Sequence, residues 1–348
     1  MFRPDKGQKV FRPIFLRYKL VMKFGSTLLL ILTLLFSSCV GEQNFFAGKG
    51  PQSHEIIKLW WTLFGIASFV TVTVSFFLVR GALKKNRDDS VNDEALGKGL
   101  VYGLIGTISL LLVIIFSTLR LGHPPEYSEG NFELKVVGKM WWWQAHYYDP
   151  EGNYLFETAN EIVIPTGRPI RIKLVSDTVI HSFWVPALAG KVDMLPGREN
   201  FLVVKADEEG VFRGQCAEFC GTQHALMSFY VKAVSEDQFS KWKEKQGKKY
   251  KRIKSHALGE RVFINSGCVK CHTIRGLGVA TDAKYYGPDL THFGSRSHIA
   301  AATYPNNKGH LGGWILDPQG AKPGNYMPAT PLSGKELNAL LEFLEALK

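Results

Sequence analysis

The chain has 348 residues, a formal net charge of +11 and a hydrophobic fraction of 45 %. Its length fits two or three domains, and its charge suits nucleic acid, anionic lipid, an acidic protein partner or simply a solvated basic surface. We discount nucleic acid because the sequence carries no basic-aromatic motif of a nucleic-acid-binding module. The five cysteines are odd in number and clustered, which makes a poor disulfide framework and indicates sites of chemistry instead.

The N-terminal region predicts an export signal over residues 1–38. Two lysines precede the apolar run STLLLILTLLFSSC (26–39), which is too short for a membrane-spanning helix and ends in small residues. Met22 is an alternative start, because the sequence from there forms a well-proportioned signal by itself. The serines before Cys39 resemble a lipoprotein cleavage site, so we expect Cys39 to be lipidated. A plain signal and an uncleaved anchor with a free thiol are the alternatives.

The next segment, residues 39–125, contains two long apolar runs at 56–80 and 100–119. Each has about 20 residues or more, enough to cross a hydrocarbon core roughly 30 Å thick. The loop between them is rich in lysine and arginine, and positive loops stay in the cytoplasm. We therefore predict a two-helix transmembrane hairpin in a bacterial cytoplasmic membrane, with everything after Leu121 on the extracytoplasmic side.

Three further segments follow, at 126–237, 238–256 and 257–348. The first alternates like strands, as in IRIKLVS (170–176), and predicts a β-sandwich or barrel. The second is lysine-rich, which indicates a solvated linker or an exposed helix, with docking of an acidic partner as the alternative. The third ends in a predicted helix with a capping box from Ser333 to Glu336 and a leucine face, formed by Leu337, Leu340, Leu341 and Leu344.

A dense set of soft donors lies near the end of the β-rich segment. Cys216 and Cys220 are four residues apart, His224 and Met227 follow, and His181 lies upstream. Thiolates, imidazoles and a thioether together select copper over hard cations. A disulfide would leave the histidine and methionine without a role, and a zinc site would gain little from methionine.

The stretch CAEFCGTQHALM (216–227), with IHSFWVPALAGKVDMLPGR (180–198) upstream, resembles the CuA signature of cytochrome c oxidase subunit II. The resemblance implies a cupredoxin-type domain in which two copper ions share two cysteine sulfurs. It also implies that the Glu218 side chain binds a magnesium ion shared with the catalytic subunit. The implied copper ligands are Cys216 and Cys220 as bridges, His181 and His224 on one copper each, Met227 as a weak ligand, and the backbone carbonyl of Glu218.

The aromatic stretch GKMWWWQAHYYD (138–149) resembles the place where members of this family receive electrons. The resemblance assigns Trp141 as the tryptophan that accepts the electron, with Trp143 beside it. The alternative is an aromatic core strand, because a run of tryptophans would also pack well in the interior.

The pentapeptide CVKCH (268–272) is a haem c attachment motif. Cys268 and Cys271 would bond the haem vinyl groups, and His272 is placed to bind the iron. A thioredoxin-type redox motif would need a βαβ context, which the sequence lacks. Met327, in KPGNYMP, is the expected sixth ligand, because a thioether in this setting is typical of class I cytochromes c. The competing candidates are His292, His298 and His310.

The resemblance covers most of residues 50–348 and predicts a multidomain membrane protein. Its expected fold is a transmembrane α-helical hairpin, a cupredoxin-like β-sandwich or barrel, and an α-helical class I cytochrome c domain. Electrons would pass from an external cytochrome c or other donor through haem c to CuA, and then to subunit I, which reduces dioxygen to water. An input subunit of a nitric oxide reductase and a stand-alone membrane electron carrier are the alternatives.

One departure from the family concerns proton uptake. Family members often carry a glutamate-tryptophan pattern before the second membrane helix, at the mouth of a proton channel. Here that region reads NDEALGKGLVYG (92–103), and the pattern does not match although Glu94 is nearby. No residue is therefore assigned to proton uptake.

Overall fold

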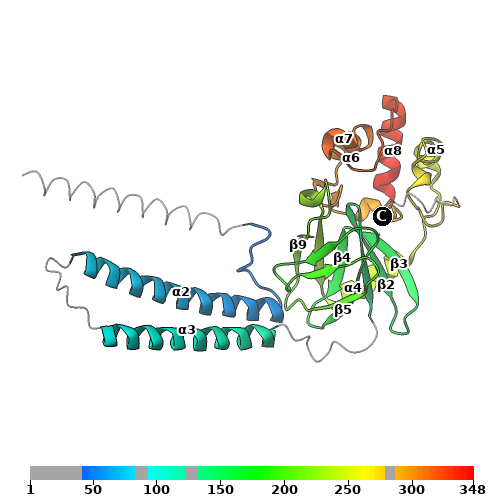
Figure 1. Ribbon diagram of the computed structural model, residues 1–348. Helices are drawn as coiled ribbons and strands as arrows, with labels where there is room; N and C mark the ends of the chain where they lie inside the picture. The colour runs from blue at the N-terminus through cyan, green and yellow to red at the C-terminus, as the bar shows by residue number, and fades with distance from the viewer. Residues whose placement is uncertain (1–40, 84–92, 122–131, 279–286) are drawn as a thin grey trace, which may run out of the picture.

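The computed structural model describes residues 41–83, 93–121, 132–278 and 287–348 (Figure 1). The expected signal peptide, the alternative start at Met22 and the expected lipidation of Cys39 lie outside the described residues. Three parts follow one another along the chain: a helix pair, a β-sandwich and a small helical domain that contacts the sandwich.

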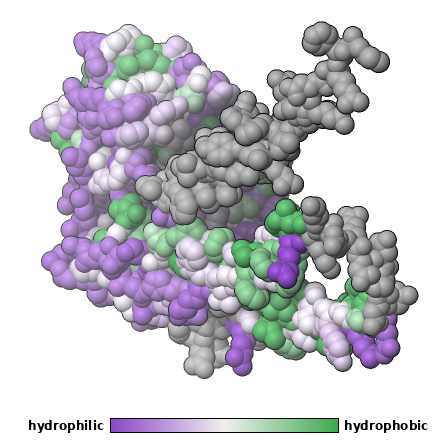
Figure 2. Space-filling view, turned by 90° about the vertical axis from the view of Figure 1, so that its left-hand side faces the viewer, coloured by the Kyte–Doolittle hydropathy of each residue, from purple (hydrophilic) through white to green (hydrophobic). Residues whose placement is uncertain are grey.

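The helix pair consists of α2 (Pro51–Leu83) and α3 (Asp93–Leu121), which lie side by side. Both are long and apolar enough to cross a membrane, with mean hydropathies of 2.1 and 2.5 over their most apolar windows and no part of those windows buried. Figure 2 shows hydrophobic residues around this pair and mainly hydrophilic residues over the remaining domains. The apolar faces therefore need a lipid environment or protein partners.

The start of α2 is tied to the β-sandwich by buried polar contacts. The Ser53 hydroxyl accepts a hydrogen bond from the Gly50 amide at 3.2 Å, and it lies 2.8 Å from the Gly50 carbonyl and 2.9 Å from the Ala187 carbonyl, to which it can donate. The backbone of Lys49 bridges two loops, donating to Ala187 and accepting from Asp207. These bonds fix the point where the helix pair meets the extramembrane part.

The β-sandwich consists of two five-stranded sheets, ordered β3-β2-β1-β5-β8 and β4-β10-β9-β6-β7. Most pairs are antiparallel, whereas β1 runs parallel to β5 and β4 parallel to β10. The strands of the first sheet are β1 (Leu134–Lys139), β2 (Trp142–Tyr148), β3 (Tyr154–Ala159), β5 (Ile170–Ser176) and β8 (Asn200–Val204). Those of the second are β4 (Glu161–Pro165), β6 (His181–Trp184), β7 (Val192–Met194), β9 (Gly210–Cys216) and β10 (Ser228–Val234).

Alternating apolar side chains form the core between the two sheets. In β5 the residues Ile170, Ile172 and Leu174 are buried while the positions between them are partly exposed, as the sequence predicts. Large aromatic side chains fill the centre, among them Trp143 and Phe183. This packing holds the strand ends, from which the candidate ligands project, in fixed positions.

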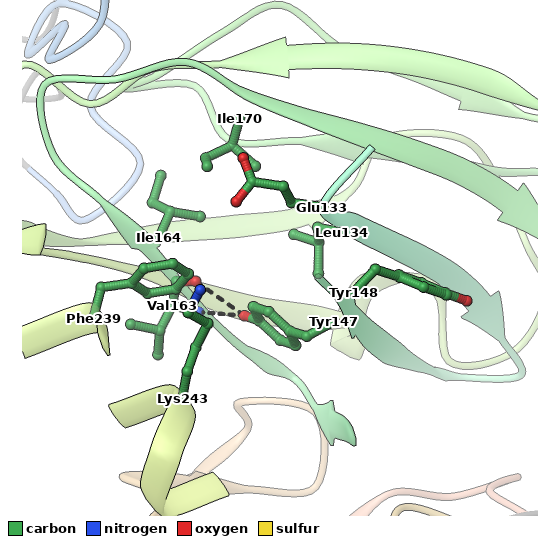
Figure 3. Close-up of a pocket in the computed structure, with 9 residues that line it drawn as sticks. All are labelled: Glu133, Leu134, Tyr147, Tyr148, Val163, Ile164, Ile170, Phe239 and Lys243. Atoms are coloured by element: carbon green, nitrogen blue, oxygen red, sulfur yellow. Dashed lines mark hydrogen bonds between the residues drawn. The ribbon is translucent and has the colours of Figure 1, made fainter. Parts of the chain in front are cut away.

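Helix α4 (Glu236–Gly247) closes one edge of the sandwich, with Phe239 in the core. Beside it the hydroxyl of Tyr147 donates to the Val163 carbonyl at 3.0 Å and accepts from the Val163 amide at 2.8 Å (Figure 3). The lysine-rich stretch, interpreted as a linker or an exposed helix, thus begins as a helix that packs on the β-domain.

The C-terminal domain is mainly helical. Its α-helices are α5 (Ala257–Asn265), α6 (Lys308–Leu316), α7 (Pro318–Ala321) and α8 (Gly334–Ala346), with a short hairpin of β11 (His298–Ile299) and β12 (Tyr304–Pro305). The predicted capping box is confirmed, because the Ser333 side chain accepts from the Glu336 amide and the Glu336 carboxylate accepts from the Ser333 amide. Helix α8 packs its buried leucine face against α5 and α6.

Candidate copper and haem sites

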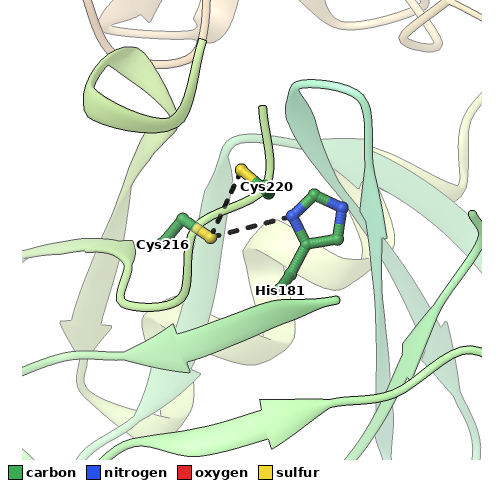
Figure 4. A group of neighbouring side chains, drawn as sticks. All are labelled: His181, Cys216 and Cys220. Atoms are coloured by element: carbon green, nitrogen blue, oxygen red, sulfur yellow. Dashed lines mark hydrogen bonds between the residues drawn. The ribbon is translucent and has the colours of Figure 1, made fainter. Parts of the chain in front are cut away.

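The first candidate site lies where strand ends and one loop converge at the rim of the sandwich (Figure 4). His181 begins β6 and Cys216 ends β9, and these two strands are hydrogen-bonded neighbours. Cys220 follows in the loop, His224 begins a 3₁₀ turn (His224–Leu226), and Met227 precedes β10. Residues from separate parts of the chain are thus held on elements that end at one place.

The donor atoms of these five residues form a connected cluster. Cys216 Sγ lies 3.7 Å from His181 Nδ1 and 3.7 Å from Cys220 Sγ. Cys220 Sγ in turn lies 3.7 Å from His224 Nδ1 and 3.8 Å from Met227 Sδ. The atoms of His181, Cys216 and Cys220 all lie within 4.8 Å of one another, and all three side chains are buried.

The distance between the two sulfur atoms shows whether Cys216 and Cys220 form a disulfide. A disulfide bond is about 2.05 Å long, so the two sulfurs, at 3.7 Å, are in contact without being bonded. A set of two thiols, two imidazole nitrogens and a thioether, buried except for the partly exposed His224, has the chemistry that suits copper. The residues present therefore fit a copper centre.

The electrostatics of the pair favour one thiolate even without a metal. Contact with the Cys220 thiol, and then with His181, lowers the pKa of Cys216 far below that of a free cysteine. The same contact and burial raise the pKa of Cys220. The first negative charge therefore develops on Cys216, next to a histidine nitrogen, and metals bind thiolates rather than thiols.

Glu218 lies between the two cysteines in the sequence, and its backbone and its side chain have different surroundings. Its backbone carbonyl is 3.2 Å from Cys216 Sγ, and so belongs to the cluster. Its side chain is partly exposed, and its carboxylate lies 3.6 Å from Lys191 Nζ. The carbonyl fits the expected copper ligand, whereas the carboxylate points outward, where a partner could reach it.

The tryptophans Trp141 and Trp143 differ in their surroundings. Trp141 donates a hydrogen bond from Nε1 to the carbonyl of Cys220 at 2.7 Å, so it touches the loop that carries the cluster. Trp143 is fully buried against Phe183 and Phe229. This position agrees with the alternative interpretation of the aromatic stretch, in which its tryptophans pack in the core. The Nε1 of Trp143 lies 3.5 Å from the Met227 carbonyl.

The second candidate site lies in the helical domain. Cys268 begins a 3₁₀ turn (Cys268–Lys270) after α5, followed by Cys271 and His272. His272 Nδ1 lies 2.8 Å from the carbonyl of Pro288. Because a carbonyl can only accept, Nδ1 carries the proton and Nε2 is left as the acceptor that could bind iron. Burial lowers the pKa of His272, which favours this neutral form.

The surroundings of His272 fit a haem ligand held in a tight cradle. A Cβ at Gly287 would come within 2.7 Å of the His272 ring, so the backbone approaches the imidazole as closely as only glycine allows. Met327 is partly buried and packs against the hydrophobic core of this domain, as Cys268 does. The donor types and the cradle fit a covalently bound haem.

The competing histidines have other partners. His292 Nε2 donates to the Lys248 carbonyl at 3.0 Å, and His298 stacks on Tyr230 with ring centroids 4.4 Å apart. His310 lies 2.9 Å from the Asn307 side chain at the start of α6. These contacts favour Met327 as the candidate sixth ligand.

The structure adds residues that the sequence did not single out. Lys322, Gln223 and Tyr326 connect the helical domain to the cluster loop or to Trp141. The only signal in the sequence is that Tyr326 precedes Met327, and adjacency alone does not indicate contact with a tryptophan 185 positions earlier.

Two family models match the chain. The periplasmic domain of cytochrome c oxidase subunit II matches residues 148–234, and cytochrome c matches residues 256–348. A cytochrome c oxidase subunit 2 from Alkalihalophilus pseudofirmus (strain ATCC BAA-2126 / JCM 17055 / OF4) is 34 % identical, over 91 % of this chain and 95 % of its own. One from Bacillus subtilis (strain 168) is 30 % identical, over 92 % and 96 %.

Among solved structures, the periplasmic domain of subunit II of cytochrome oxidase of Bradyrhizobium japonicum is similar to this chain. It is 33 % identical, covers 34 % of this chain and 94 % of its own, and has a TM-score of 0.32.

The fold and the two donor clusters define a membrane protein with extracytoplasmic electron-transfer domains, one of cupredoxin type and one of cytochrome c type. The chain belongs to the cytochrome c oxidase subunit 2 family, and it is accordingly a subunit of a haem-copper oxidase, an oxidoreductase complex. The two domains imply CuA copper in the first and haem c in the second.

Proposed function

We propose that this subunit takes electrons from an external donor at haem c, passes them to a dinuclear copper centre and delivers them to subunit I, where dioxygen is reduced to water. The observation that carries the proposal is the connected cluster of five soft donors, each within 3.8 Å of a neighbour, at the rim of a rigid sandwich. Copper can be coordinated by all of these donors, whereas a disulfide or a hard cation would leave most of them without a role.

The residues proposed to hold the cofactors are those whose donor atoms suit each metal. For copper they are His181, Cys216, Cys220, His224, Met227 and the carbonyl of Glu218; for haem c they are Cys268, Cys271, His272 and Met327. Copper and haem iron, when bound, each exchange one electron at a time.

The chain contributes rigidity, charge and exclusion of water. His181, Cys216 and Met227 have exposed fractions of 3 % or less, so water is kept away from the cluster. Hydrogen bonds from the loop backbone hold the donors in place, for example from the Cys216 amide to the Met227 carbonyl at 3.0 Å. Little then moves when charge changes, which favours fast electron transfer.

The placement in the cell is part of the proposal. The helix pair would cross the bacterial cytoplasmic membrane twice, leaving both electron-transfer domains outside. The partly exposed carboxylate of Glu218 would bind a magnesium ion at the contact with subunit I, and Trp141 would accept the electron for the copper centre. Support comes from the hydrogen bond between Trp141 and the Cys220 carbonyl.

Purification of the intact oxidase tests this function. We expect about two coppers per chain, a mixed-valence copper spectrum and haem that stays attached in a denaturing gel. Cys220→Ser should lose copper and keep the haem, whereas Cys268→Ser with Cys271→Ser should lose covalent haem. Oxygen uptake is then compared with nitric oxide uptake. Zinc in place of copper, or faster reduction of nitric oxide than of oxygen, would contradict the proposal.

A further inference from the structure

Tyr326, a surface residue of the helical domain, lies against Trp141. Trp141 also contacts residues 216–227, which carry most of the candidate copper ligands and are called the copper loop below. The ring of Tyr326 has its centroid 5.2 Å from that of Trp141, with an angle of 35° between the ring planes. Tyr326 is 69 % exposed, so burial of its own surface does not explain why it lies there. Its backbone joins directly to Met327, the candidate iron ligand.

The N–H edge of the Trp141 indole contacts the copper loop. Its indole N–H donates to the Cys220 carbonyl at 2.7 Å, and Cys220 is a candidate copper ligand. Gly221 lies against the same ring, because a Cβ there would come within 3.1 Å of the indole. Three links therefore connect Met327 to Cys220. They are the peptide bond between Met327 and Tyr326, the ring contact between Tyr326 and Trp141, and the hydrogen bond from Trp141 to the Cys220 carbonyl.

The segment that carries Tyr326 is held by polar contacts to the copper loop. Lys322 is 3 % exposed, and its ammonium donates to the Leu226 carbonyl at 2.9 Å and to the Ala300 carbonyl at 3.0 Å. The Gln223 side chain donates to the Pro323 carbonyl. Since buried polar groups cost free energy when their partners are removed, these bonds select one position for the segment.

A second set of contacts fixes the domains farther from the cluster. The Glu161 carboxylate of the sandwich accepts from the amides of Ser297 and His298 at 2.6 and 3.1 Å. Lys232 pairs with the same carboxylate at 2.6 Å. Two separate anchors oppose rotation of one domain on the other, so the contact between Tyr326 and Trp141 is held in place.

We propose that Tyr326 is the contact residue through which electrons leave the haem domain for Trp141 and the copper loop. The proposal rests on the proposed function above and adds a residue to its route. With both groups bound, one electron would pass in each transfer from reduced haem iron, which would be oxidised by one unit, to the copper pair, which would be reduced by one unit. No bond is made or broken and no proton moves, since the tyrosine ring serves only as the bridging medium.

The test uses the intact oxidase with Tyr326→Leu and Tyr326→Phe. A light pulse excites a soluble photoreductant, which gives one electron to the haem, and absorbance follows the transfer of that electron to copper. We expect Tyr326→Leu to slow this step by about tenfold, which corresponds to about 1.4 kcal/mol of activation free energy. Tyr326→Phe, which keeps the ring, should transfer at nearly the native rate. An unchanged rate in Tyr326→Leu would overturn the proposal.

Two further measurements separate a bridging role from a structural one. The haem and copper spectra and potentials, and hydrogen exchange in residues 322–327, should stay native in Tyr326→Leu. A slower transfer accompanied by exchange as fast as in Lys322→Met would overturn the proposal, because Tyr326 would then only hold the domains together. Tyr154→Leu, at a half-exposed tyrosine in β3, is the matched control and should transfer at the native rate. Failure of the proposed function would appear separately, as missing copper or haem signals in the native protein.

Discussion

At the scale of single residues, Lys322 is unusual because its charge is buried with backbone carbonyls as its hydrogen-bond acceptors. Burial lowers the pKa of Lys322 to about 8. In the unfolded chain a lysine has a pKa of about 10.4, so between these values the unfolded state binds more protons than the folded state. Stability therefore rises with pH across this window, and the cost of the buried charge is fully present below pH 8.

We expect this group to contribute an increase on the order of 3 kcal/mol in the free energy of unfolding between about pH 8 and 10.5. Denaturant unfolding of the full chain, followed by haem absorbance at several pH values, measures it. The increase should be missing in Lys322→Met and kept in Lys308→Met, at an exposed lysine that pairs with Glu345. Equal pH slopes in the native chain and Lys322→Met would show that folding does not lower the pKa of Lys322.

The sequence indicates candidate cofactor-binding residues but not their supporting contacts. Cys216, Cys220 and His224 stand close together in the chain, so their spacing is visible in the sequence. Lys322 is one of 42 lysines and arginines, and its burial depends on the meeting of two domains, to which no local pattern refers. The same holds for Glu161, which is buried and accepts hydrogen bonds from backbone amides of the other domain.

At the scale of elements, β1 and β6 pack closely because of one glycine. A Cβ at Gly138 would come within 2.7 Å of the His181 ring, tighter than real contacts allow, so the histidine would have to move. We therefore expect Gly138→Ala to displace His181 from Cys216 and to weaken copper binding, while haem stays attached. Metal analysis and the copper spectrum of the purified protein measure the effect.

Gly190→Ala is the matched control in the same domain. Its added methyl group would lie 3.6 Å from Ile56, an ordinary contact, so copper should bind as in the native chain. Full copper with an unchanged spectrum in Gly138→Ala would mean that the strand can shift away from His181 without cost. Overpacking of this kind typically costs 1–3 kcal/mol in a rigid interior, which favours movement of the side chain.

Elements with a strong local pattern were predictable from the sequence. The alternation in β5, the two apolar helices and the capping box at Ser333 each depend on neighbours within a few positions, and each is found. The order of the strands was not predictable from local pattern, because β1 pairs in parallel with β5, which follows it only after several other strands. Periodicity gives the faces of a strand but leaves its partner open.

At the scale of the whole molecule, the two electron-transfer domains are held together by two buried charged side chains, Lys322 and Glu161. Salt screens exposed charges over about 10 Å at 0.1 M ionic strength, and buried pairs far less. Exposed lysines of the stretch at 241–257, such as Lys241 and Lys248, would by contrast be screened by salt when a charged donor approaches. The internal step and the external encounter should therefore respond differently to salt.

We expect the rate from haem to copper, measured after a light pulse in the intact oxidase, to change less than about twofold between 0.02 and 0.5 M salt. Reduction of the haem by an acidic soluble protein donor should slow strongly over the same range, because its approach depends on the stretch at 241–257, which holds eight lysines and arginines and a single glutamate. The donor experiment is the internal control, since both rates are read on one preparation. A steep salt dependence of the internal step would mean that the domains separate and rejoin in each cycle, and that the contact of Tyr326 with Trp141 is only one of several arrangements.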